Sequence, residues 1–337
     1  MARIVVAGGT GYFGRAAVAL LRAQGESPVV AARHGGDVRI DVEDLSSIRE
    51  SIRSGDVVLD LAGPFQRRTT TLVEAAVDVG FHLIDIADAL GYAQKVETLR
   101  GRIEAAGIAV LTSCSSLSAV SAALVRRSGI ALPERATAFL APATRHTANP
   151  ATAASALASV GRPIRVLREG RLVDDVGWRE TRSFEFPPPV GRVRGFRNET
   201  CDAVHLPRIW PSLRTVDFWV DPNAFGLGVL LGAAAKREWV RRIVERTAPV
   251  GLAIARAVGS GRGVFGVEVE GGGRIFRQVL VGGDRAQWTA VGPAVRAARE
   301  IASGRFGHSG LVAHDLHVDP DALFASLRGV GIELLEA

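Results

Sequence analysis

The chain has 337 residues, of which 47% are hydrophobic and 23% charged, a composition typical of soluble globular proteins and not of disordered chains. This length provides for two domains with cores of their own. The formal net charge is +6, but no basic patch interleaved with aromatic residues is present, so we interpret the excess as affinity for an anionic cofactor or substrate rather than for nucleic acid.

The first predicted element is a strand over residues 3–7, followed by a glycine-rich turn and a helix to residue 24. The turn contains Gly9-x-Gly11-x-x-Gly14, the dinucleotide-binding spacing, in the strand–turn–helix context that this fingerprint requires. We expect Gly9 to permit the tight turn, Gly11 to let the backbone approach a pyrophosphate, and Gly14 to let the helix lie close to the strand. The predicted cofactor-binding residues here are Gly8, Gly9, Thr10, Gly11, Tyr12, Phe13 and Gly14.

The residues after the second predicted strand, 28–32, indicate which dinucleotide is bound. NAD-dependent enzymes place an acidic residue here for the ribose 2′-hydroxyl, whereas this chain has Arg33 and His34. A guanidinium matches phosphate oxygens, so we predict NADP(H), with Arg33 on the 2′-phosphate and His34 assisting. The alternative for Arg33 is a surface arginine. Asp41 either contacts the adenine or belongs to the acidic cluster in which Asp44 caps the next helix, and we favour the cap.

Strands and helices alternate through the rest of the first 131 residues. Strands are predicted over 57–62, 81–87 and 108–111, and helices over 45–53, 70–79, 92–106 and 118–127. This alternation predicts an α/β fold with a Rossmann-like, doubly wound parallel sheet. Ala62, Gly63 and Pro64 follow the carboxyl end of one strand, the edge where ligands lie in such sheets, so we include them among the cofactor-binding residues.

From residue 132 the pattern changes to short strands with helices between them. Strands are predicted over 135–141, 164–169, 171–176, 182–186, 215–220, 264–270 and 274–281, and helices over 150–160, 224–258 (two, split near Pro249), 292–303 and 321–327. Such an order is typical of an α+β domain on a mixed or antiparallel sheet. We expect a dinucleotide-binding domain over 1–131, a substrate and dimerisation domain over 132–290, and C-terminal helices over 291–337 that pack back on the first domain.

Several motifs occur in an order that resembles the saccharopine dehydrogenase-like oxidoreductases: residues 8–14, 62–65, 73–76 leading to 82–88, and Ser115-Ser116, with weaker likeness over 160–163, 201–202 and 214–218. The resemblance implies NADP(H), a second domain on a mixed sheet and a homodimer formed through it. It also implies that Ala62 and Gly63 lie along the nicotinamide and that the turn 113–116 closes over it. Ser113 and Ser118 stand where relatives tend to have glycine and proline, and Asn149-Pro150 stands in place of an Arg-Gly pair, so the substrate is not implied.

Hydride transfer with a nicotinamide usually needs a proton donor near the carboxyl ends of the strands. We predict Asp88, Ser115 and Tyr92 as the catalytic residues. Asp88 follows a strand end and can act as an acid if burial raises its pKa, or it caps the following helix. Ser115 likewise binds substrate or caps a helix.

Other polar residues have weaker claims. His82 is interpreted as a core or edge residue, and Cys114 as packing, because no base partner is evident. The cluster 145–149 either binds an anionic or carbonyl substrate or is a solvated loop. His308, His314 and His317 lack the spacing of a metal site and are interpreted as a surface tail, so we predict no metal.

Two cysteines, Cys114 and Cys201, are too few for a disulfide framework, so we expect a reducing, cytoplasmic location. The glycine motif begins eight residues into the chain, and we therefore expect no signal peptide. The longest apolar run, 224–235, is too short to span a bilayer.

The sequence thus predicts a cytoplasmic NADP(H)-dependent oxidoreductase that reduces or oxidises a C=O or C=N bond of a small polar metabolite in the cleft between its domains. We expect a homodimer without nucleic-acid or membrane partners. One alternative is a non-catalytic NADP(H)-binding redox sensor or interaction protein, because no proton donor is assured. A weaker alternative is association with a membrane surface through residues 224–244, where an apolar run meets a basic stretch.

Overall fold

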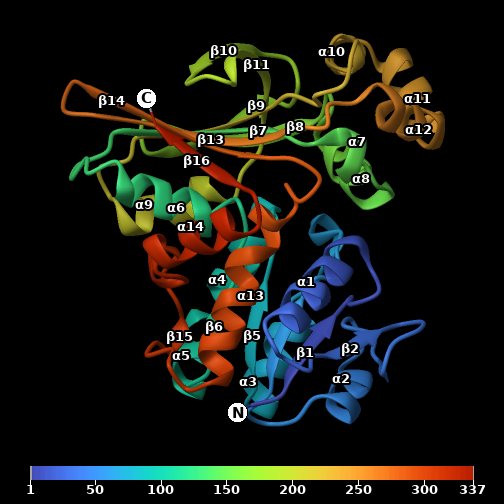
Figure 1. Cartoon of the computed structure of the whole chain (residues 1–337), viewed down its shortest axis with the longest axis vertical. Coiled ribbons are helices and arrows are strands. Elements are labelled where there is room, and N and C mark those ends of the chain that lie inside the picture. Colours follow the sequence, from blue (N-terminus) through green and yellow to red (C-terminus); the bar gives the residue numbers. More distant parts are fainter. Residues whose placement is uncertain (1, 337) are drawn as a thin grey trace. The chain divides into compact units, whose positions relative to one another are not determined.

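The computed structural model describes residues 2–336 and divides into two compact units, each with its own sheet. The first unit comprises Met1–Val120 and Ala290–Leu323, and the second comprises Ser121–Thr289 and Phe324–Ala337. Figure 1 shows the chain coloured along its sequence. Each unit is therefore built from two separate stretches of the chain.

The sheet of the first unit has seven strands, all parallel, in the order β15-β6-β5-β4-β1-β2-β3. From β1 the chain adds β2 and β3 on one side and then crosses to β4 on the other, so the strand order reverses beside β1. The predicted doubly wound parallel sheet is confirmed. The strands are β1 (Ile4–Ala7), β2 (Val29–Ala32), β3 (Val38–Arg39), β4 (Val57–Asp60), β5 (His82–Asp85), β6 (Ala109–Leu111) and β15 (Gly310–Leu311).

Helices connect these strands and bury their central members on both faces. Every residue of β1 and β4 is buried, as expected for apolar β-branched runs inside a covered parallel sheet. Local signals set the helix ends: the Asp44 carboxylate accepts the Ser46 N–H, and Gly80 and Gly107 are left-handed at the ends of α3 and α5. The helices are α1 (Tyr12–Ala23), α2 (Leu45–Ser51), α3 (Thr71–Val79), α4 (Leu90–Thr98), α5 (Arg100–Ala106) and α13 (Trp288–Ala302), with 3₁₀ turns η1 (Phe65–Arg67) and η2 (His314–Leu316).

The sheet of the second unit has nine strands, seven of them in the order β10-β11-β12-β7-β13-β14-β16, while β8 pairs with β12 and β9. Only β12 and β7 are parallel neighbours, so the predicted mixed sheet is confirmed. The strands are β7 (Arg135–Ala141), β8 (Pro163–Arg168), β9 (Arg171–Val176), β10 (Thr181–Phe186), β11 (Gly191–Asn198), β12 (Thr215–Val220), β13 (Gly263–Gly271), β14 (Arg274–Gly282) and β16 (Glu333–Glu336).

This second sheet curls over an aromatic core. Phe184 and Phe186 of β10 pack against Phe139 of β7 and Trp219 of β12, and β10 also contacts β14. Figure 1 shows α6 and α9 along the opposite face of the sheet. The helices are α6 (Ala119–Arg127), α7 (Thr144–Thr147), α8 (Pro150–Ser159), α9 (Asp202–Ile209), α10 (Leu227–Lys236), α11 (Glu238–Arg246), α12 (Ala248–Val258) and α14 (Pro320–Gly329).

Several elements differ from the sequence-based expectation. Residues 224–258 form three helices rather than two, and Pro249 lies in the first turn of α12, where its missing N–H costs nothing. Strand β11 and helix α9 were not predicted. The C-terminal residues contribute to both sheets: β15 joins the first sheet, whereas β16 pairs with β14 in the second. Among residues 2–336, no helix combines the length and apolar character needed to cross a bilayer.

Candidate functional site

The glycine turn after β1 is folded tightly against its surroundings. Gly8 is the left-handed residue, with φ of 73°, and a Cβ on it would lie 2.8 Å from the Ala62 nitrogen. A Cβ on Gly14 would lie 2.1 Å from the Gly8 oxygen, which confirms that α1 lies close to the strand end. The positive φ of this turn belongs to Gly8, and at Gly9 the Val30 side chain and the Val6 carbonyl leave no room for a Cβ.

The start of α1 provides an anion-binding end. Its N-cap is Gly11, which makes no side-chain capping bond, and no acidic residue lies in the first turn. The first amides of a helix lack partners within the helix and carry the positive end of its dipole. Thr10 and Gly11 are exposed, while Tyr12 and Phe13 form the first turn with their rings in edge contact, 5.2 Å between centroids. The turn therefore leaves an accessible cradle for a diphosphate.

Arg33 and His34 lie exposed in the loop that follows β2. The loop folds back on its strand, because Asp37 accepts the Val30 N–H at 2.8 Å and donates its own N–H to the Val30 carbonyl at 2.7 Å. Within the described part of the chain, the Arg33 guanidinium makes no hydrogen bond or ion pair. A fixed loop that presents an unpartnered guanidinium at the strand end is suited to a phosphate group.

Asp41 has a local structural role. Its carboxylate accepts the Glu43 N–H at 3.0 Å, and its own N–H donates to the Ser47 hydroxyl at 2.9 Å. Asp44 caps α2, as the favoured interpretation had it. Contact between Asp41 and an adenine stays a prediction.

The turn 62–64 follows β4 and lies against the glycine turn through the close approach of Gly8 to Ala62. Gly63 and Pro64 are exposed at this edge. Arg68 holds the turn in place, because its Nη1 donates a hydrogen bond to the Ala62 carbonyl at 2.7 Å. The structure thus brings together two predicted cofactor-binding segments that are about 50 residues apart in the sequence.

A buried ion pair beneath this turn was missed by the sequence analysis. Arg68 Nη2 lies 2.9 Å from Asp60 Oδ2, and the two side chains are 6% and 0% exposed. Arg68 Nε also contacts Glu43 Oε1 at 2.5 Å. Burial works to lower the pKa of Arg68, but the Asp60 and Glu43 carboxylates outweigh burial and raise it. The Arg68 guanidinium therefore stays charged, and its contacts fix the end of β4.

Asp85 ties the end of β5 to the serine-rich turn after β6. Its carboxylate accepts the N–H groups of Ser113 at 2.7 Å and Ala87 at 2.9 Å, and its carbonyl accepts the Cys114 N–H at 2.7 Å. The side chain is fully buried, which raises the pKa of Asp85 to about 6, and the nearby Asp60 carboxylate adds to the increase. Asp85 is thus positioned as the anchor of the turn 113–116.

The raised pKa of Asp85 predicts a specific pH dependence of stability. Because the folded chain holds this proton more tightly than the unfolded chain, the contribution of Asp85 to stability is fully present below about pH 4 and is lost as the pH rises through 6. We expect the free energy of unfolding of the native chain, minus that of Asp85→Asn, to fall by about 2 kcal/mol between pH 4 and pH 7. Urea unfolding at a series of pH values measures it.

The control for this experiment is Asp284→Asn, which removes an exposed carboxylate of the second unit. Its difference from the native chain should stay constant over the same pH range. A pH-independent difference for Asp85→Asn as well would show that folding does not raise the pKa of Asp85.

The predicted catalytic residues lie in different surroundings. Asp88 is exposed and accepts a hydrogen bond from Gln66 Nε2 at 3.1 Å; Ala89, not Asp88, is the N-cap of α4. Ser115 is buried in the turn that Asp85 anchors. Tyr92 is 2% exposed, and its hydroxyl has no hydrogen-bond partner among the residues described. Burial raises the pKa of Tyr92, and the Asp85 and Asp60 carboxylates raise it further, so its phenol keeps its proton.

The remaining candidates have structural surroundings. Cys114 is fully buried, and burial raises the pKa of its thiol, with Asp85 adding to the effect. His82 accepts the Ala109 N–H at 3.0 Å and has a pKa lowered by burial. In the second unit, Asn149 caps α8 by accepting the Thr152 N–H at 3.1 Å.

The interpretation of the tail histidines as surface residues was wrong for two of them. His314 and His317 are buried in the first unit with their rings 4.7 Å apart. Burial lowers the pKa of His317 to about 3, so this ring is neutral. Within residues 2–336, no group of histidine, cysteine and acidic side chains is arranged to hold a metal.

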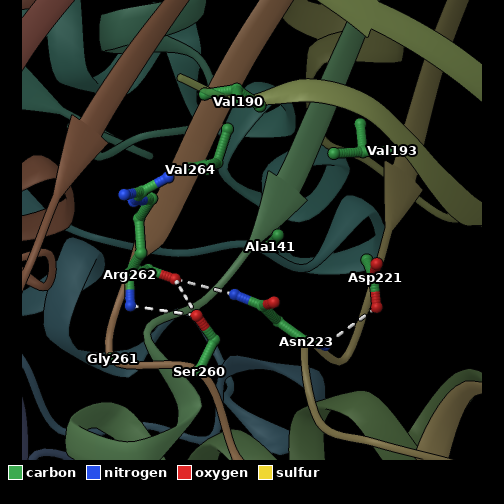
Figure 2. A pocket seen from close by; sticks show the side chains of 9 residues that line it. All are labelled: Ala141, Val190, Val193, Asp221, Asn223, Ser260, Gly261, Arg262 and Val264. Atoms are coloured by element: carbon green, nitrogen blue, oxygen red, sulfur yellow. Dashed lines mark hydrogen bonds between the residues drawn. The ribbon is translucent and has the colours of Figure 1, made fainter. Parts of the chain in front are cut away.

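The second unit contains an open pocket of about 390 Å³, shown in Figure 2, where β7 and β12 end. Asn223 joins its rim by donating to the carbonyls of Pro142 at 2.9 Å and Arg262 at 2.7 Å. Asp221 accepts the Asn223 N–H at 2.8 Å, and burial raises its pKa. Asn223 thus connects the loop that follows β12 to the loop after β7 and to the residues before β13. The pocket is lined by Ala141, Val190, Val193, Asp221, Asn223, Ser260, Gly261, Arg262 and Val264.

Comparison with protein families identifies the first unit. Residues 4–111 match the model described as the saccharopine dehydrogenase NADP binding domain. The match contains the glycine turn, Arg33, the turn 62–64 and the Asp85 anchor. The chain therefore carries a Rossmann domain for a nicotinamide dinucleotide, of the kind found in oxidoreductases. A comparison with curated proteins returns no match.

Solved structures with a similar arrangement share little sequence with this chain. GenD2 from gentamicin A biosynthesis, in complex with NAD, is 13% identical over 100% of this chain and 97% of its own, with a TM-score of 0.44. Myo-inositol 2-dehydrogenase from Lactobacillus plantarum is 10% identical over 98% of each chain, also with 0.44. The dehydrogenase MviM from Clostridium difficile is 6% identical over 98% and 99%, with 0.42. Likenesses at this level carry no argument about substrate or mechanism.

Proposed function

We propose that this chain, whose residues 4–111 match the NADP-binding domain of saccharopine dehydrogenases, is an NADP(H)-dependent oxidoreductase. The reaction proposed is reduction of a C=O or C=N bond in a small polar metabolite, or its reverse. The observation that carries the choice of cofactor is the unpartnered Arg33 guanidinium in a loop fixed to the end of β2. No acidic residue stands at this strand end to bind a ribose 2′-hydroxyl.

The residues present fit a phosphorylated dinucleotide. The turn 8–11, three of whose four residues are glycine, and the N-terminus of α1 form the cradle, in which Gly11 is exposed and makes no capping bond. We assign the diphosphate to this cradle, the 2′-phosphate to Arg33 with His34, and the nicotinamide to the edge at Ala62, Gly63 and Pro64. When bound, the cofactor supplies or accepts the hydride.

The side chains proposed to manage the proton lie along the same edge of the first sheet. Asp88 follows β5 and is exposed, so it can exchange a proton with solvent. Tyr92 retains its proton and has a buried hydroxyl with no partner among the described residues; a buried unpaired phenol is uncommon and calls for a partner. We propose Asp88 or Tyr92 as the proton donor and Ser115 as a substrate contact. Asp85 would position Ser115 by holding the turn 113–116.

Replacing Arg33 tests the choice of cofactor. We expect Arg33→Ser to raise the Kd for NADPH about 30-fold, because a charge-assisted contact to phosphate is worth about 2 kcal/mol, and to leave the Kd for NADH unchanged. Isothermal titration calorimetry measures both. Arg22→Ser is the matched control, since it removes an exposed arginine at the other end of α1. Equal loss of both nucleotides, or tighter binding of NADH by the native protein, would refute the NADP assignment.

Stopped-flow absorbance of NADPH, mixed with carbonyl and imine compounds, tests for turnover. If the native protein consumes NADPH and Asp88→Asn or Tyr92→Phe lowers the rate, the replaced residue is identified as the proton donor. Binding without turnover would favour the non-catalytic sensor. Neither of the two cysteines of the described chain is in a disulfide, and both are buried, which supports the cytoplasmic location that we propose. A homodimer is also part of the proposal, and light scattering measures it.

A further inference from the structure

Three successive helices of the second unit carry most of the exposed apolar side chains of the described chain. Of twelve large hydrophobic residues that are exposed within residues 2–336, eight lie between 225 and 258, a segment of about a tenth of the chain. Phe225 is 93% exposed just before α10, and Trp239 is 62% exposed on α11. We name residues 225–258 the α10–α12 segment. Exposed apolar side chains concentrated on successive helices in this way mark an interaction surface.

The exposed apolar residues of this segment are spaced as helix faces. Trp239 and Ile243 on α11 are four residues apart, as are Val250 and Ile254 on α12, and such pairs lie on one side of a helix. Other side chains of the same helices, Val244 and Ala255, are already buried in the unit. The helices therefore present apolar stripes beyond those that the core of the unit uses.

The α10–α12 segment is also basic. It contains Lys236 and five arginines against two glutamates, which gives a net charge of 6 − 2 = +4. Both glutamates are already paired: Glu238 lies 2.7 Å from Arg242, and Glu245 lies 2.8 Å from Arg162 outside the segment. Lys236, Arg237 and Arg246 are exposed. The surface thus combines exposed apolar side chains with an excess of positive charge.

We propose that the α10–α12 segment docks on the surface of an anionic lipid bilayer. Apolar stripes with a tryptophan insert at the boundary of headgroups and acyl chains, and lysines and arginines attract the anionic headgroups. A second copy of the chain is a poorer occupant, because it brings the same +4 charge to the interface. The proposal is independent of the proposed enzymatic function and replaces the expectation that the protein has no membrane partner.

Flotation with lipid vesicles tests this proposal. We expect the full chain to float with vesicles of phosphatidylcholine and phosphatidylglycerol in equal parts, and not with phosphatidylcholine alone. Arg237→Gln and Arg246→Gln should each lower binding about fivefold. The pair Trp239→Ser and Ile243→Ser should abolish it. Leu132→Ser with Ile275→Ser is the matched control, because these exposed apolar residues lie outside the segment and their loss should leave binding unchanged.

Fluorescence provides a second readout that does not depend on disruptive variants. We expect the anionic vesicles to shift the emission of the native protein to shorter wavelength, and we expect Trp239→Phe to float normally without that shift. Absence of flotation with anionic vesicles would overturn the proposal. A second result would also overturn it: the native protein is a dimer by light scattering and does not float with vesicles, and Trp239→Ser with Ile243→Ser converts it to a monomer. The surface would then join two copies of the chain.

Discussion

Replacing Arg68 by methionine is expected to lower the free energy of unfolding by about 4 kcal/mol, because it leaves the Asp60 carboxylate buried without its partner. The guanidinium also holds the Ala62 carbonyl at 2.7 Å, so the turn beside the glycine cradle loses its support. We therefore expect weaker binding of NADPH in the same variant. Urea unfolding and calorimetry measure the two effects separately.

Two further variants make this result specific. Arg67→Met replaces the neighbouring exposed arginine and should change stability by no more than about 0.5 kcal/mol. Asp60→Asn combined with Arg68→Met removes both charges and should recover much of the loss, because breaking a buried pair costs more than replacing it. A loss below about 1 kcal/mol for Arg68→Met alone would show that water or another cation reaches Asp60.

Adding one methyl group at Gly14 is expected to weaken NADPH binding about 100-fold and to destabilise the first unit by about 3 kcal/mol. The Cβ of Gly14→Ala would lie 2.1 Å from the Gly8 oxygen and 2.6 Å from the Gly9 Cα, and both are backbone atoms. The helix must therefore move away from the turn, which separates the amides of α1 from the rest of the cradle. Calorimetry and thermal unfolding measure the two losses.

Gly101→Ala is the matched control for Gly14→Ala. Gly101 lies in α5, and its added Cβ would meet nothing within 4 Å. That variant should bind NADPH normally and gain up to about 1 kcal/mol of stability, since alanine favours a helix. Unchanged NADPH affinity in Gly14→Ala would mean that the phosphates are not bound at the start of α1.

The fold was predictable from the sequence where a single segment contains the whole signal. The β-branched run of β1, the glycines after it and the capping Asp44 are local features, and the structure agrees with the prediction at each. Strands of two residues, such as β3 and β15, have no such signal because they are fixed only by their neighbours. Strand β11 mixes charged residues and glycine with two apolar residues, and the sheet imposes its conformation.

The candidate site likewise has parts that the sequence predicted and parts that it did not. The glycine turn and Arg33 were predicted as candidates because each occurs at a recognisable position in the sequence, after a predicted strand. The Asp60–Arg68 pair was missed because the sequence does not indicate which of the many arginines lies against the end of β4. His314 and His317 look polar in sequence, yet their surroundings exclude water.

Because the first unit is built from two separate stretches of chain, it cannot complete its sheet until late in translation. Strand β15 closes the outer side of β6 by pairing Gly310 with Ala109 and Leu311 with Val110. During synthesis on a ribosome, residues 1–120 emerge long before residues 290–323, so β6 remains an open edge while the intervening residues are added. The nascent nucleotide-binding unit is thus exposed to pairing with other chains until nearly all of the polypeptide has been translated.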